Sequence, residues 1–184
     1  MGKIKYAIAT AIVLSSFSSL TFAQSGPGIF YTNLGATIIS DGSDSESAYF
    51  GEAGYSYYFN NFLAADFSYR HTQTFNSSVS ADSDGFSSKY DSYSLGIKVE
   101  QAMGDFNLYG TAGASYIPSE TTRWDTTDGA PKTVSEDSVE PYISAGIKFS
   151  VPGSPLLLDV AVNHQLLPNS ESATSVSGGV YLMF

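Results

Sequence analysis

Charged residues recur at alternate positions within stretches of the sequence that are otherwise rich in apolar residues. They carry both signs, and they share one side of their stretches with Gly, Ser, Thr and Asn: Glu52, Asp66, Arg70, Lys98, Glu100, Glu140, Lys148 and Asp159. Such charges could pair with one another in a closed interior, or they could line a conduit for small solutes. The sequence therefore indicates either a salt-bridged plug or a narrow pore.

Other residue types and spacings give little indication of catalysis or metal binding. The two histidines, His71 and His164, fall on the apolar sides of their stretches. An amphipathic imidazole ring is tolerated at such positions, so their presence there does not require a catalytic role. The chain has no cysteine, so disulfides and thiolate metal sites are excluded. The acidic run Ser80–Gly85 is only loosely similar to a calcium loop, because Ser stands where the first Asp ligand is expected. We therefore expect no metal and no cofactor.

Stretches that alternate between apolar and polar residues must position these charges. There are eight of them, each 12 to 15 residues long: Gly28–Ile39, Ser47–Phe59, Phe62–Phe75, Lys89–Met103, Phe106–Ile117, Val139–Val151, Leu156–Leu167 and Ala173–Phe184. A period of two is typical of β-strands. The length is unusual for a globular strand but sufficient for a tilted strand to cross a membrane. The sequence predicts an all-β fold, an eight-stranded antiparallel up-and-down transmembrane β-barrel.

The connections between the stretches alternate between short and long. Asn60-Asn61, Gly104-Asp105 and Pro152–Pro155 are tight turns, and the other gaps are longer: Ser40–Glu46, Asn76–Ser88, Pro118–Ser138 and Pro168–Ser172. Short periplasmic turns and long extracellular loops are typical of outer-membrane barrels. With an even number of strands, both termini fall on the periplasmic side.

The tight turns also predict which charged residues face each other. A connection centred on Asn61 sets Glu52 opposite Arg70, and a turn at Gly153-Ser154 sets Lys148 opposite Asp159. We therefore predict lumenal ion pairs within the set Glu52, Arg70, Asp66, Lys98, Lys148 and Asp159. Because side chains fill the interior of an eight-stranded barrel, the plug is preferred to the pore.

Alternation alone leaves open which face of the barrel is outside. A soluble, lipocalin-like barrel would point its apolar face inward. The polar face here is rich in small residues and poor in Lys and Glu, unlike a soluble surface. The apolar face carries aromatic residues near both strand ends, which is typical of interfacial girdles. We therefore expect the apolar face to contact lipid.

The N-terminus has the pattern of a signal peptide. Lys3 and Lys5 precede the mostly apolar run Tyr6–Leu20, and Thr21–Ala23 provides small residues for a peptidase. We expect a signal peptide over residues 1–23 and a barrel over residues 24–184. The mature chain then has 6 basic and 18 acidic residues, a net charge of −12, which argues against a nucleic-acid partner.

The chain resembles the outer-membrane β-barrel superfamily that includes the OmpA transmembrane domain, OmpX/Ail-type proteins and OmpW. The resemblance rests on the alternating segment Val176–Phe184, with its terminal Phe184, and on the hairpin-like segment Gly54–Asp66. It implies a location in the outer membrane of a Gram-negative bacterium and recognition of Phe184 by the barrel assembly machinery. It also implies a less favoured alternative, a lipid A-modifying enzyme. Neither histidine has the Ser two residues later that the deacylase type uses, because Gln73 and Leu166 stand there.

The long gaps carry most of the charge that would face the cell exterior. They hold 11 acidic residues but only Arg123 and Lys132 as basic ones. Lipopolysaccharide bridged by divalent ions is an expected partner of such a rim. Arg123 and Trp124 are the best candidates for contact with an extracellular ligand, since Arg and Trp dominate binding hot spots. We expect a monomer with a structural or surface-interaction role and no enzymatic activity.

Overall fold

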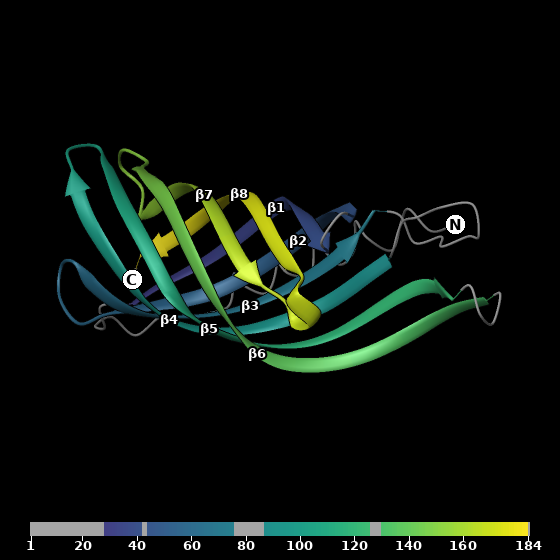
Figure 1. Ribbon diagram of the computed structural model, residues 1–184. Helices are drawn as coiled ribbons and strands as arrows, with labels where there is room; N and C mark the ends of the chain where they lie inside the picture. Colours follow the sequence, from purple (N-terminus) through teal and green to yellow (C-terminus); the bar gives the residue numbers. More distant parts are fainter. Residues whose placement is uncertain (1–27, 42–43, 76–86, 126–129, 184) are drawn as a thin grey trace, which may run out of the picture.

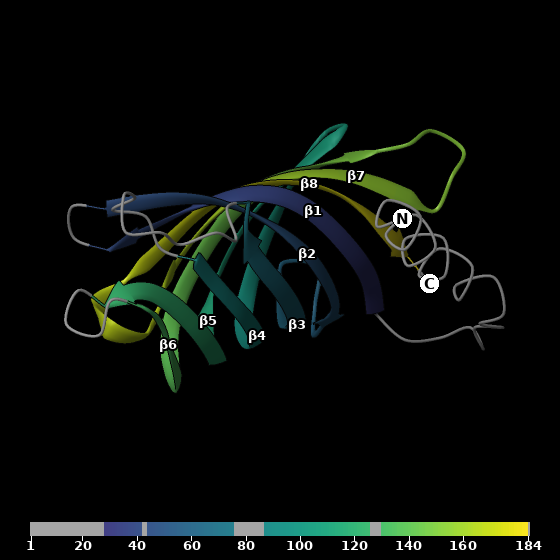
Figure 2. The same ribbon diagram turned by 90° about the vertical axis from the view of Figure 1, so that its right-hand side faces the viewer.

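The chain folds into a closed barrel of eight antiparallel strands, seen in a computed structural model that describes residues 28–41, 44–75, 87–125 and 130–183 (Figure 1). The strands are β1 (Gly28–Asp41), β2 (Asp44–Tyr58), β3 (Leu63–Thr74), β4 (Ser87–Met103), β5 (Phe106–Asp125), β6 (Ala130–Ser150), β7 (Leu156–Leu166) and β8 (Ser172–Met183). Each strand pairs with its neighbour in sequence, and β1 closes the barrel against β8 (Figure 2). The predicted fold class is confirmed.

The three short turns have the centres that the sequence predicts. Gly104 and Gly153 have φ angles of 72° and 74°, a conformation that glycine adopts without strain. Asn60 Oδ1 accepts hydrogen bonds from the backbone N–H groups of Phe62 and Leu63 at 3.0 and 2.9 Å. These turns set the register, so Glu52 lies opposite Arg70 and Lys148 lies opposite Asp159, as expected.

The opposite end of the barrel differs from the prediction. The segment Pro118–Ser138, expected to be a loop, is mostly a ribbon in which β5 and β6 continue as paired strands (Figure 1). β4 pairs with β5 as far as Thr122, so the pairs Arg123–Lys132, Trp124–Pro131 and Asp125–Ala130 extend beyond the other strands. Thr122 Oγ1 and Thr133 Oγ1 lie 2.8 Å apart across it. Hydrophobic alternation could not identify this ribbon because both of its faces are polar. Thr and Val nevertheless favour strands, and the paired backbone holds them extended.

No helix in the described part of the chain is long and apolar enough to span a membrane.

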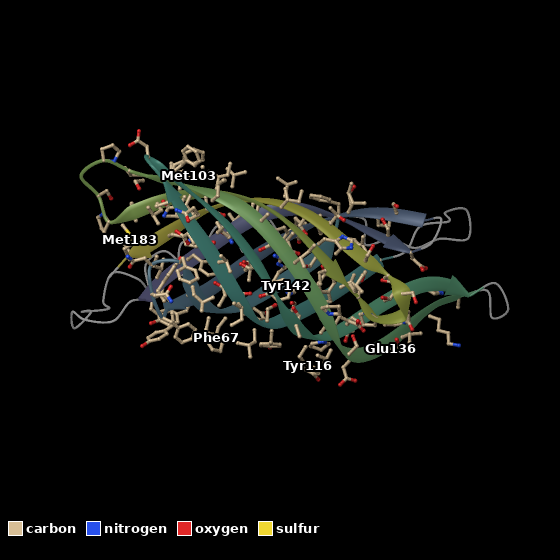
Figure 3. The ribbon with its side chains drawn as sticks, turned by 60° about the vertical axis from the view of Figure 1, so that its left-hand side comes forward. Phe67, Met103, Tyr116, Glu136, Tyr142 and Met183 are labelled. Atoms are coloured by element: carbon tan, nitrogen blue, oxygen red, sulfur yellow. The ribbon has the colours of Figure 1, made fainter. Side chains whose placement is uncertain are left out.

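The apolar face of the barrel points outward. Leu34 is 69% exposed, whereas Lys148 is 1% exposed. Phe67 projects away from the barrel, and Tyr142 projects into it (Figure 3). This arrangement excludes a soluble barrel with an apolar interior. The lumen is narrow enough that inward glycines are needed: a Cβ on Gly113 would lie 2.8 Å from the Tyr142 ring and 2.2 Å from the Leu95 carbonyl oxygen.

Candidate functional site

The outer half of the lumen contains a buried ion pair between β2 and β3. Arg70 Nη2 lies 2.5 Å from Glu52 Oε2, and both side chains are almost fully buried. Arg70 Nη1 donates to Asn163 Oδ1 at 3.1 Å, and the guanidinium lies 4.3 Å from the centroid of the Phe50 ring. The predicted Glu52–Arg70 pair is therefore present. Asn33 Nδ2 also donates to Glu52 Oε1 at 3.1 Å.

A second ion pair lies closer to the short turns. The Lys98 ammonium contacts the Asp66 carboxylate and donates to Ser56 Oγ at 2.7 Å. Tyr31 donates its hydroxyl proton to the other oxygen of Asp66 at 2.7 Å. Both Lys98 and Asp66 belong to the predicted lumenal set, although the sequence did not pair them. They lie on neighbouring strands, β3 and β4, two positions away from a direct register match.

The third ion pair corrects a prediction. Lys148 and Asp159 are register partners, yet the Lys148 ammonium lies 2.5 Å from Glu100 Oε2 and 3.0 Å from the Tyr58 hydroxyl. Asp159 instead accepts a hydrogen bond from the Tyr109 hydroxyl at 3.2 Å. The strand register identifies only residues that face each other on adjacent strands, and it does not identify partners across the lumen. In a lumen this narrow, a long side chain on β6 also reaches β4, so Glu100 competes for the same cation.

Aromatic rings link the two lysines. The Lys148 ammonium lies 4.9 Å from the centroid of the Tyr109 ring and 4.7 Å from that of Tyr181. The Lys98 ammonium lies 5.3 and 5.5 Å from the same two rings. Ring faces attract cations, especially where water is excluded. The two rings therefore stabilise a pair of like charges that would otherwise repel each other.

Apolar clusters fill the lumen at both ends. At the loop end the cluster is almost fully buried and consists of Ile39, Ala48, Tyr90, Ile117, Leu167 and Ala173. At the turn end, Ile29 packs against Tyr31, Leu157 and Tyr181. Between them lies a cavity of about 30 Å³ that Glu52, Arg70 and Lys98 help to line, room for one or two water molecules. Sequence reasoning missed these clusters, although large apolar residues at inward positions of the strand ends were visible.

The outer surface near the loop end carries a belt of tyrosines. Their hydroxyls donate to polar side chains nearby: Tyr49 to Gln73 at 3.2 Å, Tyr69 to Asp91 at 2.8 Å and Tyr116 to Asp137 at 3.0 Å. Amphipathic rings of this kind are typical of membrane interfaces. β5 and β6 continue past this belt, and Glu136 lies on their continuation beyond Tyr116 (Figure 3).

The two histidines lie on the outer surface. His71 Nδ1 is 2.8 Å from Asp91 Oδ1, and the register partners of His71 are Gly51 and Asp91, so no serine or threonine stands directly opposite it. His164 Nδ1 is 2.9 Å from Thr174 Oγ1, between Ile143 and Thr174 in the register. Neither arrangement combines a histidine, a hydroxyl nucleophile and an acid.

Several predicted residues fall outside the described part of the chain. The backbone of Arg123 and Trp124 lies in β5, opposite Lys132 and Pro131, but the side chains of Arg123 and Trp124 are not described. Phe184, the predicted signal peptide and the run Ser80–Gly85 also lie outside it. Among the described residues, no group of His, Asp and Glu side chains is arranged to hold a metal ion.

Comparison with known proteins identifies the family. Neisserial surface protein A (NspA) matches with a TM-score of 0.69 and 14% identity, over 88% of this chain and 100% of that one. Ail of Yersinia pestis matches at 0.60 and 16%, over 88% and 100%. The N-terminal barrel of Pseudomonas aeruginosa OprF matches at 0.55 and 14%, over 86% and 100%. No curated protein sequence matches significantly. The family model for the outer membrane protein beta-barrel domain matches residues 9–167, so the chain belongs to that family.

Proposed function

We propose that this protein is a closed outer-membrane anchor that presents the β5–β6 ribbon and an acidic rim on the surface of a Gram-negative cell. The contrast between a filled lumen and a projecting ribbon carries this proposal. A barrel whose interior is packed with side chains has little room for solute, whereas a ribbon beyond the membrane interface is accessible to partners. The role is structural and interactive, and the protein functions as a monomer.

Acidic side chains support an interaction role for the ribbon. Residues 118–138 contain five acidic and two basic residues. The exposed carboxylates would attract divalent cations, and through them lipopolysaccharide, or the basic surface of an extracellular partner. At an ionic strength of 0.1 M, exposed charges more than roughly 10 Å apart are largely screened from each other. Added salt should therefore weaken this attraction.

A deletion that preserves the strand register tests the proposal. Ser119 and Glu136 are register partners joined by a hydrogen bond from Ser119 Oγ to the Glu136 carbonyl, so a two-residue Asn-Gly turn can replace Glu120–Ser135. Cells displaying this variant should lose binding to host cells, matrix or lipopolysaccharide that the intact protein confers, while barrel insertion persists. The double variant Arg123→Ala, Trp124→Ala keeps the ribbon and tests those two side chains alone. Unchanged binding by the shortened barrel would leave only a structural role.

The pore and the enzyme remain testable alternatives. The filled lumen favours little steady conductance in planar bilayers, so large stable channels formed by the purified barrel would favour the pore. A lipid A hydrolase should lose activity when His71 or His164 is replaced. We expect no such activity, because neither histidine has a nucleophile and an acid beside it.

Fractionation tests the location and the processing. The mature chain should begin at Gln24, after removal of residues 1–23, and should be found in the outer membrane with a mobility that changes on boiling. Recovery as a soluble periplasmic protein would overturn the proposal.

A further inference from the structure

A groove lies on the outer, lipid-facing wall of the barrel, across β1 to β4. Its volume is about 670 Å³, within the range of roughly 300 to 1,000 Å³ that is usual for small-molecule sites. Ala53 is the smallest outward side chain in it, and the larger ones come from all four strands: Phe30, Tyr55, Phe67, Tyr69, Tyr93 and Leu95. Phe67 projects away from the barrel (Figure 3), so the groove opens towards the hydrocarbon of the membrane.

Two pairs of aromatic rings line the groove. The ring centroids of Phe30 and Tyr55 lie 4.6 Å apart, and those of Tyr69 and Tyr93 lie 5.2 Å apart. Rings packed at these distances stabilise one another. A site whose walls are already held in place costs less to fill, because few side chains must be ordered on binding.

The loop end of the groove reaches the belt of tyrosines. Tyr69 belongs both to the groove and to this belt, which is typical of a membrane interface. On β2, the next outward residue towards the loops after Ala53 is Gly51, which has no side chain and lies opposite His71. An acyl chain lying in the groove would therefore have its headgroup beside His71 and Asp91.

The polar side chains at this level carry both signs of charge. Asp91 Oδ1 accepts a hydrogen bond from the Tyr69 hydroxyl at 2.8 Å and lies 2.8 Å from His71 Nδ1. The Asp91 side chain is nevertheless 33% exposed. Lys89, the next outward residue of β4 towards the loops, is exposed, and Glu120 of β5 lies opposite it in the register. The cluster therefore offers one ammonium and two carboxylates to a headgroup.

We propose that the groove and this polar cluster bind one phospholipid with a primary ammonium headgroup. An acyl chain lies in the groove, the ammonium donates to Asp91, and the phosphate lies beside Lys89. A primary ammonium has three N–H donors for such a contact, whereas a quaternary ammonium has none. The excess of carboxylates disfavours a lipid whose headgroup carries only negative charge. The site lies on the wall of the barrel and does not depend on whether the ribbon binds a partner.

The test uses the whole barrel in phosphatidylcholine nanodiscs that contain a small fraction of one lipid with a spin-labelled acyl chain. The labelled lipid is phosphatidylethanolamine, phosphatidylglycerol or phosphatidylcholine, and electron paramagnetic resonance separates lipid held by the protein from freely moving lipid. The held fraction of phosphatidylethanolamine should exceed that of phosphatidylcholine at least about threefold, as expected for an accessible charge-assisted hydrogen bond. Phosphatidylglycerol should show no such excess. Equal fractions of the three lipids, or a preference for phosphatidylglycerol, would overturn the proposal.

Matched variants separate the groove from the rest of the lipid-facing wall. Ala53→Leu fills the groove and should remove the excess of held phosphatidylethanolamine. Ala112→Leu makes the same change at an exposed position of β5 outside the groove and should leave the excess intact. Equal loss in both variants would mean that lipid contacts the whole wall without a site. A mobility that changes on boiling confirms that each variant is a folded barrel.

A second pair of variants tests the headgroup contact without altering the groove. Asp91→Asn keeps the size of the side chain but removes its charge, so the preference for phosphatidylethanolamine over phosphatidylcholine should disappear. Asp105→Asn removes the same charge at an exposed position of the short turn between β4 and β5, at the other end of the barrel, and should leave the preference unchanged. A preference that survives Asp91→Asn would show that this carboxylate does not hold the ammonium and would overturn the assignment.

Discussion

The lumen and the β5–β6 ribbon use the same kinds of polar residue but in opposite environments. In the lumen, Lys98 and Lys148 are almost fully buried, and each contacts a carboxylate. On the ribbon, Thr133 and Glu136 are exposed. Buried charges must be compensated within the barrel, whereas exposed ones remain available to partners. The comparison teaches that burial, more than residue type, separates the structural part of this protein from its interactive part.

The largest expected effect comes from removing one lumenal charge. Arg70→Ala leaves Glu52 buried without its cation and should lower the free energy of unfolding by about 3 to 5 kcal/mol. Adding Glu52→Gln should recover part of this loss, because the two side chains interact directly. Urea unfolding in phospholipid vesicles, followed by circular dichroism, measures both.

The exposed residue Lys89 supplies the control for this measurement. Lys89→Ala should change stability by less than about 0.5 kcal/mol, as surface substitutions usually do. If the losses from Arg70→Ala and Glu52→Gln were additive, the two residues would not be coupled. The contrast between lumen and ribbon would then not rest on ion pairing.

The next effect concerns the apolar cluster at the loop end. Ile117 is fully buried, so Ile117→Ala should leave a cavity. The free energy of unfolding should fall by about 2 to 4 kcal/mol. Conductance should nevertheless remain low, because the Glu52–Arg70 pair and the Lys148–Glu100 pair still fill the lumen below it. Planar-bilayer recording tests this expectation. Steady channels from Ile117→Ala alone would show that the cluster, and not the charged layer, closes the barrel.

The sequence predicts the barrel well because each strand has one apolar and one polar face. The same alternation and the tight turns predict that Glu52 lies opposite Arg70. Partners across the lumen are harder to predict, since they depend on how far a side chain such as Lys148 reaches beyond its neighbouring strand. The ribbon was mistaken for a loop because a strand exposed on both faces has no hydrophobic period.

Shortening the ribbon should affect stability much less than either lumenal change. Among the described residues, replacing Glu120–Ser135 by Asn-Gly removes Glu120 and residues 130–135, which are exposed, and the half-buried Thr121 and Thr122, which pair with β4. It takes no member of the apolar lumenal clusters. We expect a change in the free energy of unfolding of less than about 1 kcal/mol, since surface changes away from the core are usually small. A loss as large as that of Arg70→Ala would show that the ribbon is part of the barrel's structural core.

The smallest effect should come from the threonine pair on the ribbon. Thr122 and Thr133 share a hydrogen bond of 2.8 Å, but Thr133 is exposed, so water can replace the partner that Thr133→Ala removes. Cross-strand pairs of this kind contribute roughly 0.2 to 1 kcal/mol, and exposure favours the lower end. The same urea titration should therefore show almost no shift, whereas hydrogen exchange should accelerate locally at Thr122. A large global shift from Thr133→Ala would mean that the ribbon and the barrel unfold as one cooperative unit. Local exchange without a global shift would show that the ribbon opens independently of the barrel, as a segment that must accommodate a partner can do.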